Sequence, residues 1–181
     1  MSGGETLKIF EKAGTFADLV VLISQGDREE QQDFYGYYLN ETDCYVAVCD
    51  GMGGYVHGEL ASRIALDTFL TYCAVFGSEE KIPQVMREAV YAADDLISGI
   101  TDENGNAVQM GTTSVQVLIR GRNLYWNSVG DSRIYLLRRG QFVQVTTDHT
   151  YRTVLNEKFQ VGQITETEMQ QELQSGEKLV N

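Results

Sequence analysis

The sequence is short of positive charge and has no long hydrophobic run. Its 181 residues include 14 Lys and Arg against 26 Asp and Glu, which gives a formal net charge of −12. So acidic a chain does not offer the basic face that binds nucleic acid. The longest early apolar run, residues 19–23, is far too short to span a bilayer, and the first residues lack the basic region of a secretory signal. We therefore expect neither nucleic acid nor a membrane among the partners.

Cysteine is also scarce, and its spacing excludes a common metal site. Cys44, Cys49 and Cys73 are odd in number and lack the C-x-x-C spacing of a zinc site. Cys44 and Cys49 lie in or beside an expected strand, and Cys73 lies on the apolar side of an expected helix, so we interpret all three as buried thiols. Together with the lack of a targeting segment, this predicts a cytoplasmic protein.

Hydrophobic periodicity predicts an α+β fold. A period-two alternation between residues 112 and 119 is typical of a half-buried strand, and short turns at 120–123 and 138–141 predict that three consecutive strands form an antiparallel meander. The expected strands are residues 18–24, 33–39, 44–49, 112–119, 123–129, 133–138 and 141–146.

Helical spacing of apolar residues predicts two long helices between these strands. The first covers about residues 58–76, and the second begins near Pro83, which is acceptable in a first turn, and continues to about residue 100. Two shorter helices are expected at residues 151–159 and 165–173. Thr165 and Glu168 have the spacing of a capping box at the start of the last one.

The most informative stretch is residues 49–59, C-D-G-M-G-G-Y-V-H-G-E, between a strand and a helix. Asp50 ends the strand, and three glycines follow within four residues. An acid at a strand end can face a cleft, and the glycines let the backbone, including the Gly51 carbonyl, approach a ligand closely. A tight strand-to-helix turn explains an isolated Asp-Gly pair equally well. The other motifs decide between these two readings.

Those motifs occur in a fixed order and together resemble a known family. The chain is similar to the metal-dependent protein serine/threonine phosphatases of the phosphatase 2C-like (PPM) type, in their bacterial form, from about Arg28 to Thr150. The family pattern reads R-x-x-N-x-D, D-G-M-G-G-x-x-x-G-E-x-A-S, G-T-T, V-G-D-S-R and D-H-[ST]. The resemblance implies an antiparallel β-sandwich flanked by helix pairs, in α-β-β-α layers.

The resemblance also implies a site with two divalent cations, Mn²⁺ or Mg²⁺, and a third that is held more weakly. Two such ions about 3.5–4 Å apart activate a water and clamp the phosphoryl oxygens. By resemblance, Asp50 bridges both ions, the Gly51 carbonyl ligates one, and Asp33 supplies another ligand or holds a metal-bound water. Asp50 and Asp33 are thus the expected catalytic residues. They are oxygen donors, which hard cations prefer.

Two other candidates, Arg28 and Asp131, each allow two interpretations. Arg28 fits substrate phosphate because a guanidinium offers paired donors, although local sequence alone favours a surface arginine; its spacing to Asp33, which matches the family, favours the phosphate role. Asp131 either caps a turn or ligates the third metal, as the family implies. We interpret His149 as a structural hydrogen-bonding residue and His57 as a solvated one at a helix start.

The chain departs from the family pattern in two places and ends early. Gln31-Gln32-Asp33 stands where members usually have Asn-Glu-Asp or Asn-Gln-Asp, so Gln32 is a neutral amide where some members have a Glu ligand. Tyr55 replaces a common His. Family members continue past a flap-like region, here about residues 151–181, into strands whose Ser-Asp-Gly and Asp-Asn motifs ligate metal. We therefore expect one domain over residues 1–181 that lacks its C-terminal strands, and a 181-residue chain that is weak or inactive alone.

The leading functional hypothesis is an enzyme that removes phosphate from phosphoserine and phosphothreonine of cytoplasmic proteins. Its partners would be phosphorylated proteins, in the setting of a cognate Ser/Thr kinase and its substrates. The rival hypothesis is a non-catalytic member, either a phosphoprotein-binding or regulatory module or a fragment with an incomplete metal site. The third hypothesis is that the recognisable motifs support a structural scaffold only.

Overall fold

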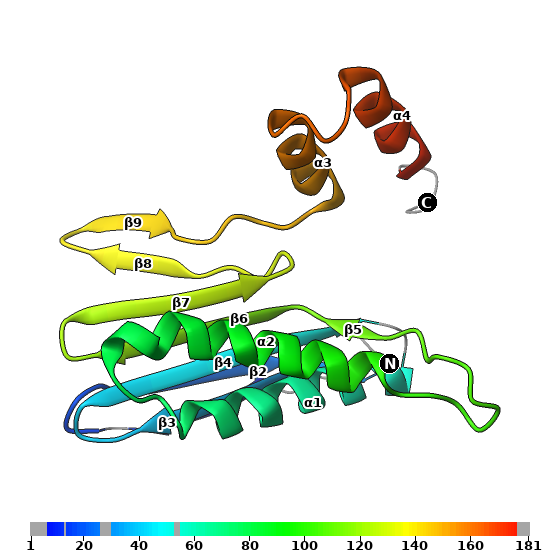
Figure 1. Cartoon of the computed structure of the whole chain (residues 1–181). Helices are drawn as coiled ribbons and strands as arrows, with labels where there is room; N and C mark the ends of the chain where they lie inside the picture. Colours follow the sequence, from blue (N-terminus) through cyan, green and yellow to red (C-terminus); the bar gives the residue numbers. More distant parts are fainter. Residues whose placement is uncertain (1–6, 13, 26–29, 53–54, 177–181) are drawn as a thin grey trace, which may run out of the picture. The chain divides into compact units, whose positions relative to one another are not determined.

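The structure is a computed structural model that describes residues 7–12, 14–25, 30–52 and 55–176. The chain divides into two compact units, Met1–Ser128 and Val129–Asn181. The predicted α+β class with antiparallel sheets is confirmed (Figure 1). The expectations of one domain over 1–181 and of a flap-like region over 151–181 stay predictions.

The first unit is built on a central antiparallel sheet in the order β3-β4-β6-β7, with β5 pairing β4. A separate antiparallel pair joins β1 to β2. The sequence pattern did not predict β1. The strands are β1 (Leu7–Lys12), β2 (Leu19–Ser24), β3 (Asp33–Leu39), β4 (Asp43–Met52), β5 (Gly111–Thr112), β6 (Ser114–Arg120) and β7 (Asn123–Val129).

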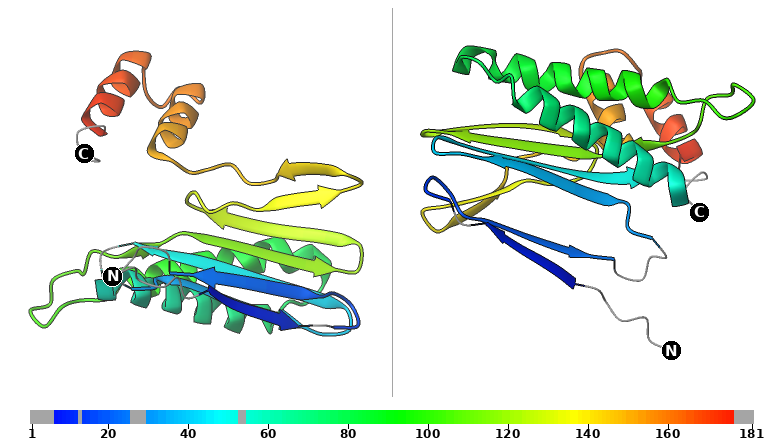
Figure 2. Two further views of the ribbon diagram at one scale, coloured as in Figure 1. Left: turned by 180° about the vertical axis from the view of Figure 1, so that it is seen from behind. Right: turned by 90° about the horizontal axis from the view of Figure 1, so that it is seen from below.

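Two helices cover one face of this sheet, as Figure 2 shows. They are α1 (Tyr55–Cys73) and α2 (Ile82–Ser98), and a short 3-10 turn, η1 (Glu79–Lys81), precedes α2. Alternate residues of β4, namely Tyr45, Ala47 and Cys49, are fully buried against the helices. The apolar core therefore lies between the helices and one face of the sheet, and the other face carries Asp50.

The three cysteines are free and buried, as the sequence predicted. Burial raises the pKa of the Cys49 thiol to about 12. A thiol in such surroundings stays protonated at neutral pH and is a poor nucleophile. Cys49 therefore acts as a small apolar core residue.

One predicted strand and the predicted meander are corrected by the structure. The strand expected at 112–119 is divided at Thr113, which belongs to neither β5 nor β6. Hairpin β6–β7 is present, and a second hairpin joins β8 (Tyr135–Arg138) to β9 (Gln141–Gln144). The backbone φ is positive at Gly121 in the first turn and at Arg139 and Gly140 in the second. The meander expectation is wrong because β8–β9 forms a two-stranded sheet of its own. The backbone of Ile134, before β8, bonds to Thr146 and Val145.

The second unit contains this hairpin and two helices. Its elements are β8 (Tyr135–Arg138), β9 (Gln141–Gln144), α3 (Tyr151–Gln160) and α4 (Glu166–Gly176). The predicted capping box is confirmed, because Thr165 N–H donates to Glu168 Oε2 at 2.7 Å and Glu168 N–H donates to Thr165 Oγ1 at 3.3 Å. Among the described residues, no helix is long and apolar enough to cross a membrane.

Candidate active site

The register of β3 and β4 places Asp33 directly opposite Asp50. Residues that face each other in an antiparallel pair point to the same side, with Cβ atoms roughly 4.5–5.5 Å apart. Asp50 is exposed between the buried residues Cys49 and Gly51, so both carboxylates lie on the face away from the helices. The structure thus brings together the two carboxylates that the sequence singled out.

This pair fits a divalent cation. Like charges directly opposite each other in a sheet are destabilising, so a bound cation would relieve the repulsion between Asp33 and Asp50. Carboxylate oxygens are also the donors that Mg²⁺ prefers. Among the described residues, no three His, Cys, Asp or Glu side chains gather as a metal-holding group. Within the described part of the chain, the donors identified on this face are these two carboxylates, to which backbone or water oxygens would add.

A turn at the far end of the same hairpin sets this register. The side-chain Oδ1 of Asn40 accepts hydrogen bonds from the N–H groups of Thr42 at 2.8 Å and Asp43 at 2.7 Å. Asn favours such turns because its side chain bonds to the backbone two residues on. With the turn fixed, strict pairing from Leu39 onward carries Asp33 to Asp50.

Gly51 and Gly58 serve helix packing. A Cβ at Gly51 would overlap the carbonyl group of Gly58 in the first part of α1. The Gly51 N–H donates to the Gln32 carbonyl at 3.2 Å, and the Ser62 hydroxyl donates to the same carbonyl at 2.7 Å. Gly51 and Gly58 therefore allow α1 to lie directly against the ends of β3 and β4. The metal-ligand role of the Gly51 carbonyl stays a prediction.

The two glutamines before Asp33 support the start of β3. Gln31 Oε1 accepts the Asp33 N–H at 3.1 Å, and Gln31 Nε2 donates to the Ser24 carbonyl at 3.3 Å. Gln32 Oε1 lies 2.6 Å from the point where a Cβ on Gly58 would stand. The Gln32 side chain therefore packs on the start of α1, which gives the amide at the usual Glu position a structural role.

The segment Gly-Thr-Thr holds the backbone of Asp50, a role that the sequence alone did not reveal. Thr113 N–H donates to the Asp50 carbonyl at 2.8 Å. The Thr112 hydroxyl oxygen lies 3.0 Å from the same Asp50 oxygen and 2.8 Å from the Thr113 carbonyl oxygen. In return, the Asp50 N–H donates to Thr113 Oγ1 at 3.3 Å. The family resemblance was the one available signal, because these residues are distant in sequence.

Two predicted site residues are not placed beside this pair. Arg28 lies outside the described residues. Asp131 is exposed in the second unit, in a turn where Gly130 has φ of 90° and its carbonyl accepts the His149 N–H at 2.8 Å. The phosphate role of Arg28 and the metal role of Asp131 therefore stay predictions.

An ion pair supports the turn that holds Asp131. The Arg133 guanidinium makes a two-point contact with the Asp148 carboxylate, with Nε lying 2.9 Å from Oδ1. This pairing lowers the pKa of Asp148. It connects the V-G-D-S-R segment to the D-H-[ST] segment, so the two motifs form one local structure.

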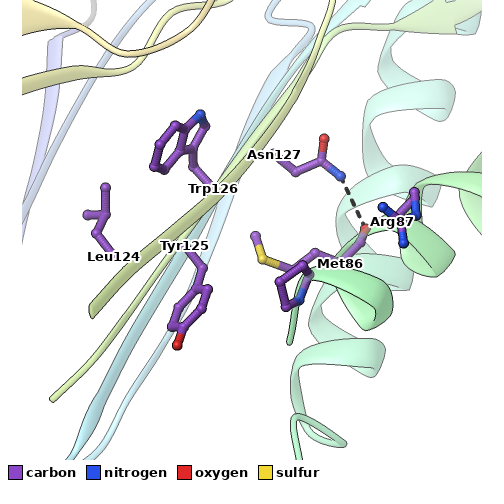
Figure 3. A pocket seen from close by; sticks show the side chains of 7 residues that line it. Met86, Arg87, Leu124, Tyr125, Trp126 and Asn127 are labelled. Atoms are coloured by element: carbon purple, nitrogen blue, oxygen red, sulfur yellow. Dashed lines mark hydrogen bonds between the residues drawn. The ribbon is translucent and has the colours of Figure 1, made fainter. Parts of the chain in front are cut away.

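The first unit also contains a hollow of about 370 Å³ (Figure 3). Met86 and Arg87 of α2 and residues 124–127 of β7 line it, with Pro83. Tyr125 and Asn127 point to the helix side of β7, and Leu124 and Trp126 point to the other side. None of its lining residues is a predicted site residue. Asp50 is exposed, which suits ions that keep bound water.

Comparison with known proteins identifies the family. The model of the family described as Protein phosphatase 2C matches residues 23–158. The chain belongs to the protein phosphatase 2C family. This confirms the resemblance read from the motifs, and the match covers both Asp33 and Asp50.

Curated relatives of this phosphatase 2C chain come from several bacteria. It is 29% identical over 130 residues to a putative protein phosphatase of Mycoplasma genitalium, covering 67% of the chain and 50% of the relative. It is 33% identical over 127 residues to the serine/threonine protein phosphatase PstP of Mycobacterium tuberculosis, covering 68% of the chain and 23% of the relative. The chain thus spans about half the length, or less, of these relatives.

Solved structures of the family share the fold. A serine/threonine phosphatase of S. agalactiae superposes with a TM-score of 0.63 at 27% identity, covering 91% of this chain and 63% of that one. The catalytic domain of PstP in complex with two manganese ions superposes with a TM-score of 0.60 at 25% identity, covering 91% of this chain and 63% of that one. The architecture of this chain is therefore that of phosphatase 2C structures.

Proposed function

We propose that this chain carries the Asp33–Asp50 half of the catalytic site of a protein serine/threonine phosphatase that depends on Mn²⁺ or Mg²⁺. The observation that carries the proposal is the direct pairing of Asp33 with Asp50 on one sheet face. Family membership and relatives named as serine/threonine phosphatases support the same reaction. The proposed substrates are proteins phosphorylated on Ser or Thr by a kinase in the cytoplasm.

Each residue has a distinct part in this proposal. When bound, the cations supply a water-derived nucleophile at neutral pH and relieve negative charge on the phosphoryl oxygens. Asp50 and Asp33 hold the ions, the Gly51 carbonyl adds a neutral oxygen ligand, and Asp131 serves a third ion. Arg28 binds the substrate phosphate through paired N–H donors. In this proposal the chain supplies the carboxylates that balance the charge of the ions and the guanidinium that orients the phosphate.

The manganese complex of PstP supports the choice of metal. That relative is described with two manganese ions, and Mn²⁺ and Mg²⁺ both suit carboxylate, carbonyl and water ligands. Two ions on this chain are therefore the proposed number, with Mn²⁺ as the convenient probe.

Asp50→Asn tests the proposal, with Asp67→Asn as a matched control on the exposed side of α1. Electron paramagnetic resonance counts free Mn²⁺ during titration of the 181-residue chain, and hydrolysis of para-nitrophenyl phosphate is followed in parallel. We expect Asp50→Asn to lose Mn²⁺ binding and Asp67→Asn to bind Mn²⁺ as the wild-type chain does, with whatever weak hydrolysis the wild-type chain shows lost only in Asp50→Asn. Undiminished Mn²⁺ binding by Asp50→Asn, or none by the wild-type chain, would contradict the proposal.

A further inference from the structure

The strand beside β4 is interrupted at the residue that faces Asp50. Val48 pairs with Val115 on one side of this point, and Gly51 pairs with Thr112 on the other side. Both pairs have the same register, so no residue is inserted between them. Thr113 therefore lies opposite Asp50, yet it belongs to neither β5 nor β6. Irregularities in sheets are common next to active sites, where they redirect a side chain.

The hydrogen bonds at this point differ from those of a regular ladder. A hydrogen-bonded antiparallel pair exchanges two backbone N–H···O=C bonds. Thr113 N–H makes one of them, to the Asp50 carbonyl at 2.8 Å, but the Asp50 N–H donates to the Thr113 hydroxyl oxygen at 3.3 Å. One ladder bond is thus replaced by a bond to a side chain.

This replacement makes the position of Asp50 depend on residue type. Any residue can supply a backbone carbonyl, whereas only a side chain with an acceptor at the right distance can receive the Asp50 N–H. Thr113 is 4% exposed, so water has little access to take over the bond. The backbone that carries the Asp50 carboxylate is therefore held by a buried hydroxyl.

We propose that Thr113 is a positioning residue for Asp50, whose hydroxyl sets the geometry of the carboxylate facing Asp33 and thereby the affinity of the cation site. The inference rests on the proposed function, because it concerns the same metal ligands. Replacing a residue that hydrogen-bonds to a metal ligand and orients it typically changes the metal affinity by about 10–100-fold.

The test compares Thr113→Val, which keeps the shape but removes the acceptor, with Thr113→Ser, which keeps the hydroxyl. Thr68→Val is the matched control, because Thr68 is a partly buried threonine of α1 whose hydroxyl bonds only within its helix. We expect Thr113→Val to weaken Mn²⁺ binding by about 10-fold or more, and both Thr113→Ser and Thr68→Val to bind as the wild type does. Thr113→Ala is made alongside and carries the same expectation as Val.

Amide hydrogen exchange adds a readout that needs no metal. The Asp50 amide should exchange faster in Thr113→Val than in wild type and Thr113→Ser, and amides in the middle of β4 should not change. Wild-type Mn²⁺ affinity in Thr113→Val or Thr113→Ala, or equal weakening in Thr113→Ser, would overturn the inference. Asp50→Asn separates the two proposals. If Asp50→Asn leaves Mn²⁺ binding intact, the proposed metal site itself is wrong. If Asp50→Asn abolishes Mn²⁺ binding and Thr113→Val does not weaken it, only the proposed role of Thr113 is wrong.

Discussion

The hydroxyl of Ser62 lies 2.7 Å from the carbonyl oxygen of Gln32 and connects α1 to the residue before Asp33. Ser62 is fully buried, and its Oγ also lies 2.8 Å from the Gly58 carbonyl. The same Gln32 oxygen accepts the Gly51 N–H. One carbonyl thus joins the helix, the loop before Asp33 and the residue after Asp50.

Ser62→Ala should lower the free energy of unfolding by about 1 kcal/mol, because one buried hydrogen bond is lost while Gln32 keeps its second donor. Urea unfolding measures the change, with exposed Ser98→Ala at the end of α2 as the control. We also expect the Asp33 amide to exchange faster with solvent. An equal loss of stability in both variants would contradict a specific role of Ser62.

Gly51→Ala should destabilise the chain by about 1–3 kcal/mol, the usual range for overpacking. The new methyl group would overlap the backbone of Gly58, which cannot move without shifting α1. Gly58→Ala should cost less, because the nearest atom is the end of the flexible Gln32 side chain, although Gly51 backbone also lies 3.0 Å away. Gly77→Ala is the control, since no atom lies within 4 Å of its added Cβ. Thermal unfolding should rank the three variants in this order.

The ion pair between Asp43 and Arg120 predicts a pH dependence of stability. Arg120 Nε and Nη2 contact the two Asp43 oxygens at 2.9 and 2.7 Å, and the bond from Arg120 lowers the pKa of Asp43. A lowered pKa in the folded state stabilises the fold above the unfolded pKa, roughly 3.9. This contribution is lost as the pH falls through the folded-state value.

Asp43→Asn should therefore cost roughly 2–3 kcal/mol near pH 7, where a charged and largely buried pair is broken. The difference from wild type should shrink as the pH is lowered from about 5 toward 3. Urea unfolding across this pH range measures it. Glu59→Gln removes the exposed pair with Arg63 and should change stability by about 0.5 kcal/mol or less. A pH-independent difference for Asp43→Asn would show that charge is not the cause.

Arg28→Ala should chiefly raise the KM for a phosphopeptide, because losing a charge-assisted phosphate contact costs roughly 1.5–3 kcal/mol. Arg28→Lys should recover part of the loss, since an ammonium keeps the charge but not the paired donors. Steady-state hydrolysis of a phosphothreonine peptide by the complete protein, with the C-terminal strands of the family, gives both constants. An unchanged KM and kcat in Arg28→Ala would show that Arg28 is a surface arginine that does not bind the substrate phosphate.

The sequence by itself determined the class of fold, the family and most element positions. Residues 33–39 and 123–129 were predicted with the bounds that β3 and β7 have, and the helices were placed within a few residues. Such elements follow from local periodicity and turn residues, and the Thr165–Glu168 capping box is equally local. Family motifs singled out Asp33 and Asp50 without showing that they are neighbours.

Only the tertiary structure decided how those motifs act on one another. The pairing of Asp33 with Asp50 depends on strand register, and the bond from Asp50 to Thr113 joins residues that lie 63 positions apart. The overlap that forbids a side chain at Gly51 arises only where α1 crosses the strand ends. No local pattern encodes these contacts, because each depends on the approach of segments that chain folding alone brings together.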